Sequence, residues 1–352
     1  MVRFGPARLA AGTAIEGSHA RFEQSTPALH RAGHSRAGSL TVRGVKMTTE
    51  GIRLVGPTRD PGGGDVRVTV SSSGICGSDL HVASFGPSWA ILGHEFSGRL
   101  DDGTPVSVLP VIRCGSCDRC LAGAEQQCRN ALGSMYGVSL DGGLADEVWV
   151  HPSCAVPLPD GLALEQAHLV EPLAVALHGI NRAGVVDGMR LLVLGAGPIG
   201  LCTVAVAGHL GASVELEGHR PRRTAVGERL GASLDVGTDY DVVLDAAGTQ
   251  SSLDRATDLV RPGGTVGILG TYWSPVTLGL SFQMKELTLI PSFTYGHHHG
   301  AVEFAEATRI LDAVPDLDDA LTTHRFGLDD AAEAFRVAAD PDEDPIKVAV
   351  HP

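Results

Sequence analysis

The alternation of hydrophobic and polar positions divides the chain into two kinds of region. Between residue 52 and about residue 160, short β-like runs are separated by clusters of Gly, Pro and Asp. This spacing is typical of a small β barrel or sandwich. The expected strands of this region are residues 66–70, 105–109 and 145–150.

Between about residue 173 and residue 296 the pattern is different. Strand, turn and helix follow one another repeatedly, which predicts a parallel sheet covered by helices. The expected strands are residues 191–194, 214–217, 242–245, 265–269 and 287–291. The end of the chain predicts helices over residues 301–311 and 328–339 and a last strand over residues 346–350.

The first segment differs in charge from the rest. Residues 1–46 carry seven basic and two acidic side chains, whereas the whole chain has a net charge of -14. Residues 1–37 show neither a strand period nor a helix period, so we expect a disordered basic tail; a transit peptide, or sequence upstream of a true start at Met47, are the alternatives. Residues 40–43 predict a first strand paired with residues 51–55, and a start at Met47 would remove it.

Composition excludes several classes of function. The chain has 41 Asp and Glu but only 27 Lys and Arg, and this net negative charge opposes binding to nucleic-acid phosphates. No apolar run reaches the length of a membrane-spanning helix. Seven cysteines without a signal-peptide pattern favour metal ligands or free thiols over disulfides. We therefore expect a cytoplasmic protein with a small-molecule partner, and neither nucleic acid nor a membrane as partner.

Four cysteines follow one another at the spacing C-x2-C-x2-C-x7-C. They are Cys114, Cys117, Cys120 and Cys128. Four thiolates at this spacing can surround one tetrahedral ion with every position filled, which predicts a structural zinc site. A zinc finger that contacts DNA needs a basic surround, and here only Arg113, Arg119 and Arg129 are close in sequence. We therefore interpret the site as a clamp for its loop.

A second group of metal-binding side chains lies outside this loop. Cys76 is followed by His94 and Glu95, and Glu171 comes far downstream. A mixed set of thiol, imidazole and carboxylate is typical of an open, catalytic zinc site. Asp79 could hold the second ring nitrogen of His94 and so fix its tautomer.

Together these motifs closely resemble the zinc-dependent medium-chain dehydrogenases, the alcohol and polyol dehydrogenase family. The resemblance spans about residues 38–350 and is carried by GICGSDLH, GHE, the four-cysteine loop and EPLAVALHG, in that order. It implies an α/β fold. A GroES-like β-barrel catalytic domain would cover residues 38–172, a Rossmann domain with a doubly wound parallel sheet residues 173–296, and a return to the catalytic domain residues 297–352.

The resemblance also implies roles for the metal ligands. Cys76 and His94 would hold a catalytic zinc ion with Glu95 or Glu171 completing the shell, so two zinc ions are expected per chain. A glutamate at position 171, where simple alcohol dehydrogenases have cysteine, resembles the polyol, sugar and threonine branch. This favours a substrate with neighbouring hydroxyl groups.

The implied reaction is hydride transfer between an alcohol, polyol or sugar hydroxyl, or the matching carbonyl, and a nicotinamide cofactor. Ser78 stands where the family places a relay hydroxyl, and His81 would pass the proton outward; a packed surface histidine is the alternative. In a family-like arrangement, the substrate pocket would lie near residues 84–89, Tyr136 and residues 272–274.

Two other functions stay open at this point. One is a dehydrogenase-like protein that binds without catalysis, and the other is a zinc-free reductase of enones or quinones. Residues 297–299, three consecutive histidines, are interpreted as the crossover back into the catalytic domain, and Cys154 and Cys202 as buried thiols. A homodimer or homotetramer is expected.

A glycine-rich turn marks the cofactor site. The stretch Gly195, Gly197, Pro198, Ile199 and Gly200 follows an expected strand and opens a helix, which is the context that a dinucleotide-binding motif requires. The resemblance adds two further glycines to this site, Gly248 and Gly270. Residues 234–241 leave no room for the helix that usually separates two strands of such a domain, so we expect a trimmed sheet edge.

The end of the next strand bears on the choice of cofactor. The position of the acidic residue of NAD-linked relatives falls on Gly218 and is followed by a basic run, which predicts a pocket for the 2'-phosphate of NADP. This run comprises His219, Arg220, Arg222 and Arg223. In the alternative, Glu217 binds the ribose of NAD and the arginines are solvated. We expect NADP rather than NAD.

Overall fold

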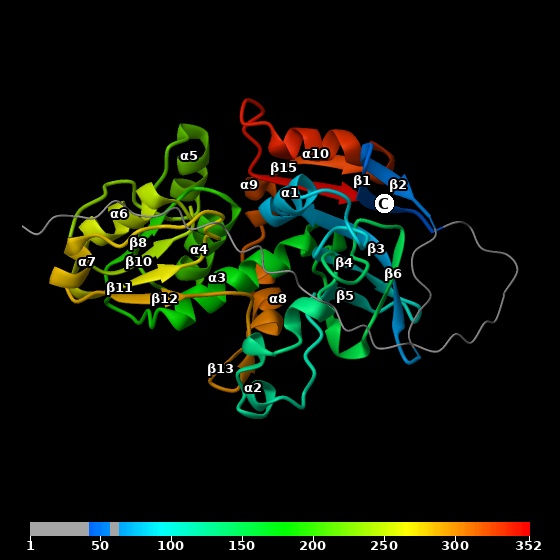
Figure 1. Ribbon diagram of the computed structural model, residues 1–352, viewed down its shortest axis with the longest axis horizontal. Coiled ribbons are helices and arrows are strands. Elements are labelled where there is room, and N and C mark those ends of the chain that lie inside the picture. The colour runs from blue at the N-terminus through cyan, green and yellow to red at the C-terminus, as the bar shows by residue number, and fades with distance from the viewer. Residues whose placement is uncertain (1–41, 57–62) are drawn as a thin grey trace, which may run out of the picture. The chain divides into compact units, whose positions relative to one another are not determined.

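The computed structural model describes residues 42–56 and 63–352, and Figure 1 labels its elements. The tail expected over residues 1–37 lies outside the described residues. Residues 40–352 belong to one unit by their contacts.

The described chain begins with an antiparallel hairpin of β1 (Gly44–Thr48) and β2 (Gly51–Val55). The first strand therefore lies closer to β2 than predicted, and residues 42 and 43 are not in a strand. The cause is a tight turn, because the hydroxyl of Thr48 donates to the carbonyl of Gly51 at 2.9 Å. A turn this short pairs β2 with the residues directly before it.

A seven-stranded sheet forms the lobe that we call the catalytic lobe. Its strands follow the order β15-β16-β3-β4-β5-β7, and β6 pairs with β3 beside this path. All pairs are antiparallel except β15 with β16. The strands are β3 (Val66–Ile75), β4 (Glu95–Leu100), β5 (Pro105–Val108), β6 (Glu147–Val150), β7 (Ala155–Pro157), β15 (Thr322–Gly327) and β16 (Lys347–His351).

A five-stranded parallel sheet forms the second lobe, which we call the nucleotide lobe. Its order is β12-β11-β10-β8-β9, so the direction of chain progression reverses between β8 and β10. Ligands of such sheets bind at this reversal, outside the carboxyl ends of the strands. The strands are β8 (Leu191–Leu194), β9 (Val214–Glu217), β10 (Tyr240–Asp245), β11 (Val260–Ile268) and β12 (Thr288–Pro291).

The helices pack around these sheets, and α3 contacts both α4 and α8 (Figure 1). The α-helices are α1 (Gly77–Ser84), α2 (Asp118–Leu121), α3 (Val170–Arg182), α4 (Pro198–His209), α5 (Pro221–Arg229), α6 (Gln250–Leu259), α7 (Leu280–Met284), α8 (Glu303–Ala313), α9 (Leu317–Leu321) and α10 (Ala331–Ala339). Short 3-10 turns are η1 (Glu125–Gln127), η2 (Ala131–Ser134), η3 (Pro152–Cys154), η4 (Leu164–Leu169) and η5 (Leu328–Asp330). A small hairpin joins β13 (His297–His298) and β14 (Ala301–Val302). Within the described residues, no helix combines the length and apolar character that crossing a membrane requires.

The trimmed sheet edge that we predicted is present. No helix or strand lies between α5 and β10, and β9 is the edge strand. A hydrogen-bonded loop replaces the helix: the Tyr240 hydroxyl donates to the carboxylate of Glu215 and accepts the N–H of Gly237 at 2.7 Å. The guanidinium of Arg190 stacks 4.7 Å above the Tyr240 ring. These contacts hold the loop in place at the edge of the sheet, where the usual helix is missing.

Candidate active site

The expected catalytic ligands Cys76, His94 and Glu95 converge at the join of β3 and β4. Gly74 of β3 is paired with Glu95 of β4, so Cys76, which caps α1, comes close to His94. One ligand atom from each of the three side chains lies within 4.8 Å of the other two. We call these three side chains the metal cluster.

A buried carboxylate supports the metal cluster. Asp79, only 2% exposed, accepts the backbone N–H of Cys76 at 2.9 Å. Its other oxygen lies 3.3 Å from His94 Nδ1, an atom with no aligned hydrogen bond. Burial lowers the pKa of His94, but the carboxylate of Asp79 and the thiol of Cys76 together outweigh this effect, and the pKa lies well above its ordinary value. Asp79 thus orients the ring and leaves Nε2, 3.4 Å from Ser78 Oγ, facing the other ligands.

The two candidate glutamates differ in their surroundings. The carboxylate of Glu95 accepts two hydrogen bonds from Lys347 Nζ, at 2.6 and 2.7 Å, and both side chains are buried. Glu171, at the start of α3, is not part of the cluster of three formed by the described residues. Burial raises the pKa of Glu171 to about 7, because the charged form loses its hydration. The phenol of Tyr295 is fully buried and lies close enough to Glu171 for each group to affect the pKa of the other.

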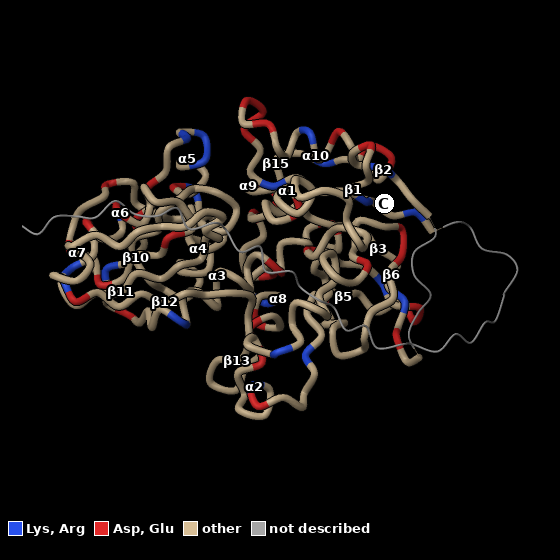
Figure 2. Tube along the Cα trace, viewed as in Figure 1, with Lys and Arg blue, Asp and Glu red and all other residues tan. Residues whose placement is uncertain are grey.

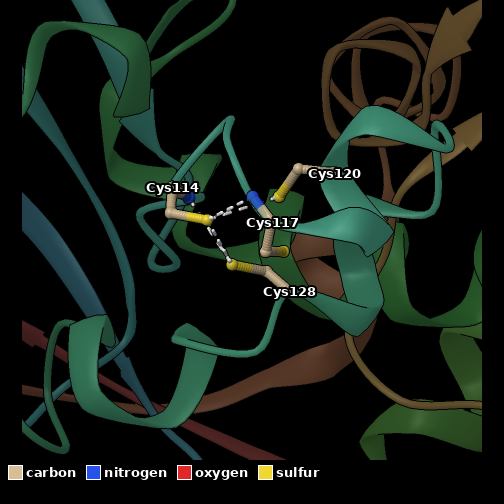
Figure 3. A group of neighbouring side chains, drawn as sticks. All are labelled: Cys114, Cys117, Cys120 and Cys128. Atoms are coloured by element: carbon tan, nitrogen blue, oxygen red, sulfur yellow. Dashed lines mark hydrogen bonds between the residues drawn. The ribbon is translucent and has the colours of Figure 1, made fainter.

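The four thiols of the cysteine loop also come together. Cys114 Sγ lies 3.9 Å from Cys120 Sγ and 3.6 Å from Cys128 Sγ, and Figure 3 shows the side chains turned toward one another. A tetrahedral zinc ion with bonds of about 2.3 Å needs sulfur atoms ~3.8 Å apart. Backbone N–H groups of Ser116 and Cys117 lower the pKa of Cys114 to about 6. The loop therefore holds four sulfur donors at the spacing of a closed zinc site.

The basic side chains around the cysteine loop are neutralised. Arg129 and Arg113 form ion pairs with Asp118 at 2.6 Å and with Glu125 at 2.7 Å. Arg113 also donates to the backbone carbonyl of Tyr295 at 2.6 Å. The hydrogen bond ties the loop to the segment of Tyr295, and the ion pairs agree with a clamp rather than a phosphate-binding surface.

The glycine turn opens at the reversal point of the parallel sheet. Gly195 has a φ of 103°, and a Cβ on Gly200 would lie 1.8 Å from the Gly195 carbonyl, so neither position accepts a side chain. A Cβ on Gly197, the N-cap of α4, would meet nothing within 4 Å. The start of α4 thus presents free N–H groups to open space, as a pyrophosphate site requires.

The other two predicted glycines meet each other beside this turn. A Cβ on Gly270 would lie 2.5 Å from the backbone nitrogen of Gly248. Asp245, at the end of β10, accepts the N–H of Gly248 at 3.1 Å and the hydroxyl of Tyr272 at 2.6 Å. Two loops therefore cross closely at the carboxyl ends of β10 and β11.

Most of the charged residues that bear on cofactor choice form ion pairs with other side chains of the chain. Glu217, the last residue of β9, forms a bidentate ion pair with Arg255 at 2.8 and 3.0 Å. The backbone of Gly218 packs against the glycine turn, since a Cβ there would lie 2.8 Å from that of Ala196. The guanidinium groups of Arg220 and Arg223 contact Asp344, and His219 is exposed.

Comparisons with known proteins agree with this geometry. Residues 62–160 match the alcohol dehydrogenase GroES-like domain. The chain is 30% identical over 306 residues to L-galactonate-5-dehydrogenase of Escherichia coli (strain K12), covering 78% of this chain and 88% of that protein. It is 31% identical over 330 residues to L-arabinitol 4-dehydrogenase of Aureobasidium melanogenum, covering 82% and 87%.

The chain belongs to the alcohol and polyol dehydrogenase family. Its fold also matches that of a Sinorhizobium meliloti 1021 protein that is described as a zinc-binding dehydrogenase and was solved with NADP. The TM-score is 0.79 at 29% identity, with 89% of this chain and all of that chain covered. The resemblance seen in the sequence is thereby confirmed, as are the fold class and the activity: the protein is an oxidoreductase of alcohols or polyols that uses a nicotinamide cofactor.

Some expected site residues of this dehydrogenase lie elsewhere. Tyr136 is not a pocket wall: it is 3% exposed, packs in the core and accepts the N–H of His151 at 2.7 Å. His297 begins the β13 hairpin and lies 3.5 Å from Glu125, and no metal-binding cluster among the described residues includes it. Cys154 and Cys202 are buried, as predicted.

The structure adds residues that the sequence reasoning missed. Lys347 pairs with Glu95 across 252 positions, and Tyr295 lies beside Glu171. A signal for Lys347 was present, because it is the single charged residue in the apolar strand of residues 346–350. Trp273 stacks on the ring of His81 with centroids 4.0 Å apart, and only its general position was foreseen.

Proposed function

We propose that this dehydrogenase oxidises a hydroxyl group of a polyol, sugar or sugar acid, and reduces the matching carbonyl, at the metal cluster. The observation that carries the proposal is the convergence of Cys76, His94 and Glu95 within 4.8 Å, on a support that Asp79 provides. The relatives named for L-galactonate and L-arabinitol support a substrate with neighbouring hydroxyl groups.

The residues of the metal cluster fit a zinc ion. Thiolate, imidazole and carboxylate are the donors that catalytic zinc sites use, and a set with three of them leaves a position open. We propose Cys76 and His94 as fixed ligands, with Glu95 or Glu171 as the third. Such an ion supplies Lewis acidity, which lowers the pKa of a substrate hydroxyl, and the nicotinamide accepts the hydride.

The chain itself must then carry the proton away from the hydroxyl. Ser78 and His81 are three positions apart on α1 and therefore share one face of the helix. Ser78 Oγ accepts the proton near His94 as its own hydroxyl proton passes toward His81, and His81 in turn releases a proton to solvent. The ring of Trp273 stacks on His81 and keeps the imidazole in place. Reduction of a carbonyl uses the same groups in reverse.

The cysteine loop is proposed to hold the second zinc ion. Cys114, Cys117, Cys120 and Cys128 supply four sulfur donors, which leaves no open position for a substrate. Its role is to stabilise the segment that reaches Tyr295 through Arg113.

We propose NADP as the preferred cofactor, bound at Gly195, Gly197, Pro198, Ile199 and Gly200, with Gly248 and Gly270 beside them. Gly218 offers no carboxylate to repel a 2'-phosphate, and Arg255 neutralises the nearby Glu217. Arg220 and Arg223 lie two and five positions after Gly218 and carry the charge that such a phosphate needs. A structure of similar fold was solved with NADP.

The domain limits, the cellular location and the oligomeric state are also proposed. The domain limits at residues 172 and 296 are those of the sequence prediction. All seven cysteines lack disulfide partners, which supports a reducing, cytoplasmic location. Assembly as a homodimer or homotetramer is proposed from the resemblance alone.

A substrate screen tests the proposed function. Polyols, sugars, sugar acids and simple alcohols are offered with NADP and with NAD, and the absorbance of the reduced nicotinamide is followed. We expect turnover of substrates with neighbouring hydroxyl groups, with a higher kcat/KM for NADP. Turnover of simple alcohols alone, or reduction of enones with no oxidation of any hydroxyl, would contradict the proposal.

A further inference from the structure

A loop of the catalytic lobe is held by the arginines that follow Gly218. This loop, residues 341–345, connects α10 to β16 and is called the clamp loop here. Arg220 is the N-cap of α5, and Arg222 and Arg223 lie in its first turn. Figure 2 marks these basic residues on α5 and the acidic loop after α10.

Five hydrogen bonds join the arginines to the clamp loop. Arg223 donates to Asp344 Oδ1 at 2.8 Å and to the Pro345 carbonyl at 2.6 Å. Arg220 donates to the same carboxylate oxygen at 3.2 Å and to the Pro341 carbonyl at 2.8 Å. Arg222 reaches the Asp344 carbonyl at 3.4 Å. One carboxylate thus lies between two guanidinium groups, in the arrangement with which arginines bind a phosphate.

Asp344 adopts a backbone conformation that costs free energy. Its φ is 45°, in the left-handed region that residues other than Gly, Asn and Asp rarely occupy. The side chain is 21% exposed and that of Arg223 is 19% exposed, so the pair is partly shielded from water. The carboxylate is therefore partly shielded from water and is held by hydrogen bonds from Arg220 and Arg223.

The clamp loop lies where a 2'-phosphate would compete for the same cations. Gly218 packs against Ala196 of the glycine turn and precedes Arg220 by two positions. Beside the arginines, a cavity of about 420 Å³ separates α5 from α9 and is lined by Arg222 and Ile346 among others. Ile346 follows the clamp loop directly, so the cavity borders the end of this loop.

We propose that Asp344 is an internal competitor of the cofactor 2'-phosphate and so sets the discrimination between NADP(H) and NAD(H). This inference rests on the proposed function. Binding of NADPH replaces the carboxylate of Asp344 on Arg220 and Arg223 with the 2'-phosphate and releases the clamp loop. Binding of NADH leaves these ion pairs intact. The chain therefore binds NADPH more weakly than Arg220 and Arg223 would without Asp344.

The test compares Asp344→Asn with wild-type protein in fluorescence titrations of NADPH and NADH. Asparagine accepts the left-handed conformation and keeps an acceptor oxygen but loses the charge. We expect NADPH to bind about tenfold more tightly to Asp344→Asn, because a charge-assisted contact no longer has to be broken. The affinity for NADH is expected to change by less than about twofold.

The matched control is Asp342→Asn, which removes the same charge from an exposed side chain of the clamp loop. It is expected to leave the ratio of the two affinities unchanged. Asp344→Gly, which also suits a positive φ, is a second variant and should tighten NADPH binding in the same way.

The outcomes distinguish a failure of the proposed role of Asp344 from a failure of the proposed function. The role of Asp344 is overturned if the ratio of NADPH affinity to NADH affinity does not rise in Asp344→Asn or Asp344→Gly. It is also overturned if this ratio rises equally in Asp342→Asn. Both results would leave the dehydrogenase function intact. Wild-type protein that binds neither NADPH nor NADH would overturn the proposed function, and the inference with it.

Discussion

Lys347 and Glu95 form a buried ion pair beside the thiol and imidazole of the metal cluster. Their side chains are 2% and 0% exposed. Desolvation of Lys347 acts to lower its pKa, yet the carboxylate of Glu95 and the thiol of Cys76 raise the pKa above its ordinary value. Lys347 therefore stays charged, and it fixes Glu95 at the edge of the metal cluster.

Removal of this cation should destabilise the fold. Lys347→Met leaves the carboxylate of Glu95 buried without a partner, and we expect the free energy of unfolding to fall by about 3 kcal/mol. Urea unfolding at pH 7 measures the change. The double variant Lys347→Met with Glu95→Gln should recover part of the loss, and an unaltered stability of Lys347→Met would show that the pair has no such role.

Asp79 should govern the affinity of the metal cluster. Asp79→Asn keeps an acceptor for the Cys76 N–H but loses the charge that faces His94. We expect the affinity of the metal cluster for its zinc ion to fall by about 10- to 100-fold, while the cysteine loop keeps its ion. Competition with a chelator measures both ions. The exposed Asp102→Asn is the control, and equal affinities in the two variants would contradict the role of Asp79.

At the scale of single residues, local motifs could be predicted and distant partners could not. GICGSDLH and GHE come together because β3 and β4 are neighbours, and the spacing of the four cysteines is short enough to define its own loop. Lys347 lies 252 positions from Glu95, and its place depends on the register of β16 beside β3. The single charge in an apolar strand marks Lys347 as unusual, but its partner depends on the pairing of two strands that are far apart in the sequence.

Among the elements, η4 is joined through His168 to two strands of the catalytic lobe, β3 and β15. The imidazole exchanges hydrogen bonds with Ser72 of β3 at 2.8 Å and with Thr322 of β15 at 3.1 Å. Burial lowers the pKa of His168 to about 3, because the charged imidazole loses its hydration, and the positive charge of Lys347 lowers it further. The ring is therefore neutral in the folded protein at neutral pH.

This histidine should make stability depend on pH. The unfolded chain takes up a proton near pH 6.5 and the folded chain only near pH 3, so the contribution of His168 is complete above pH 6.5 and falls as the pH drops toward 3. Relative to His168→Gln, wild-type protein should lose about 1 kcal/mol between pH 7 and pH 5.5. Urea unfolding at both pH values measures this, and parallel changes in the two proteins would contradict it.

The order of elements was largely predictable from pattern, and the strand pair at the start was predicted with the correct second strand but with the first strand misplaced. The strands Leu191–Leu194 and Val214–Glu217 have the predicted bounds, since each is a short apolar run that ends at a turn. The first strand shifted to Gly44–Thr48 because the Thr48 turn, not apolar character, decides the pairing. The loop that replaces the helix before β10 was foreseen from length alone.

For the whole molecule, the charge pattern supports a protein that binds a small anionic cofactor rather than a polyanion. Acidic residues outnumber basic ones by 41 to 27, and the arginines near the cysteine loop and at the start of α5 are paired with carboxylates. The metal cluster has three donors and leaves a position open for chemistry, whereas the four donors of the cysteine loop leave none, so we propose a structural task for the loop.

The measurement that tests the central claim most directly is the zinc content of wild-type protein and of Cys76→Ala, taken together with polyol oxidation. We expect two zinc ions per chain in the wild type, and in Cys76→Ala one zinc ion, an unchanged fold by circular dichroism and activity lowered by at least about a thousandfold. A Cys76→Ala variant with the zinc content and activity of the wild type would contradict a catalytic zinc ion at the metal cluster.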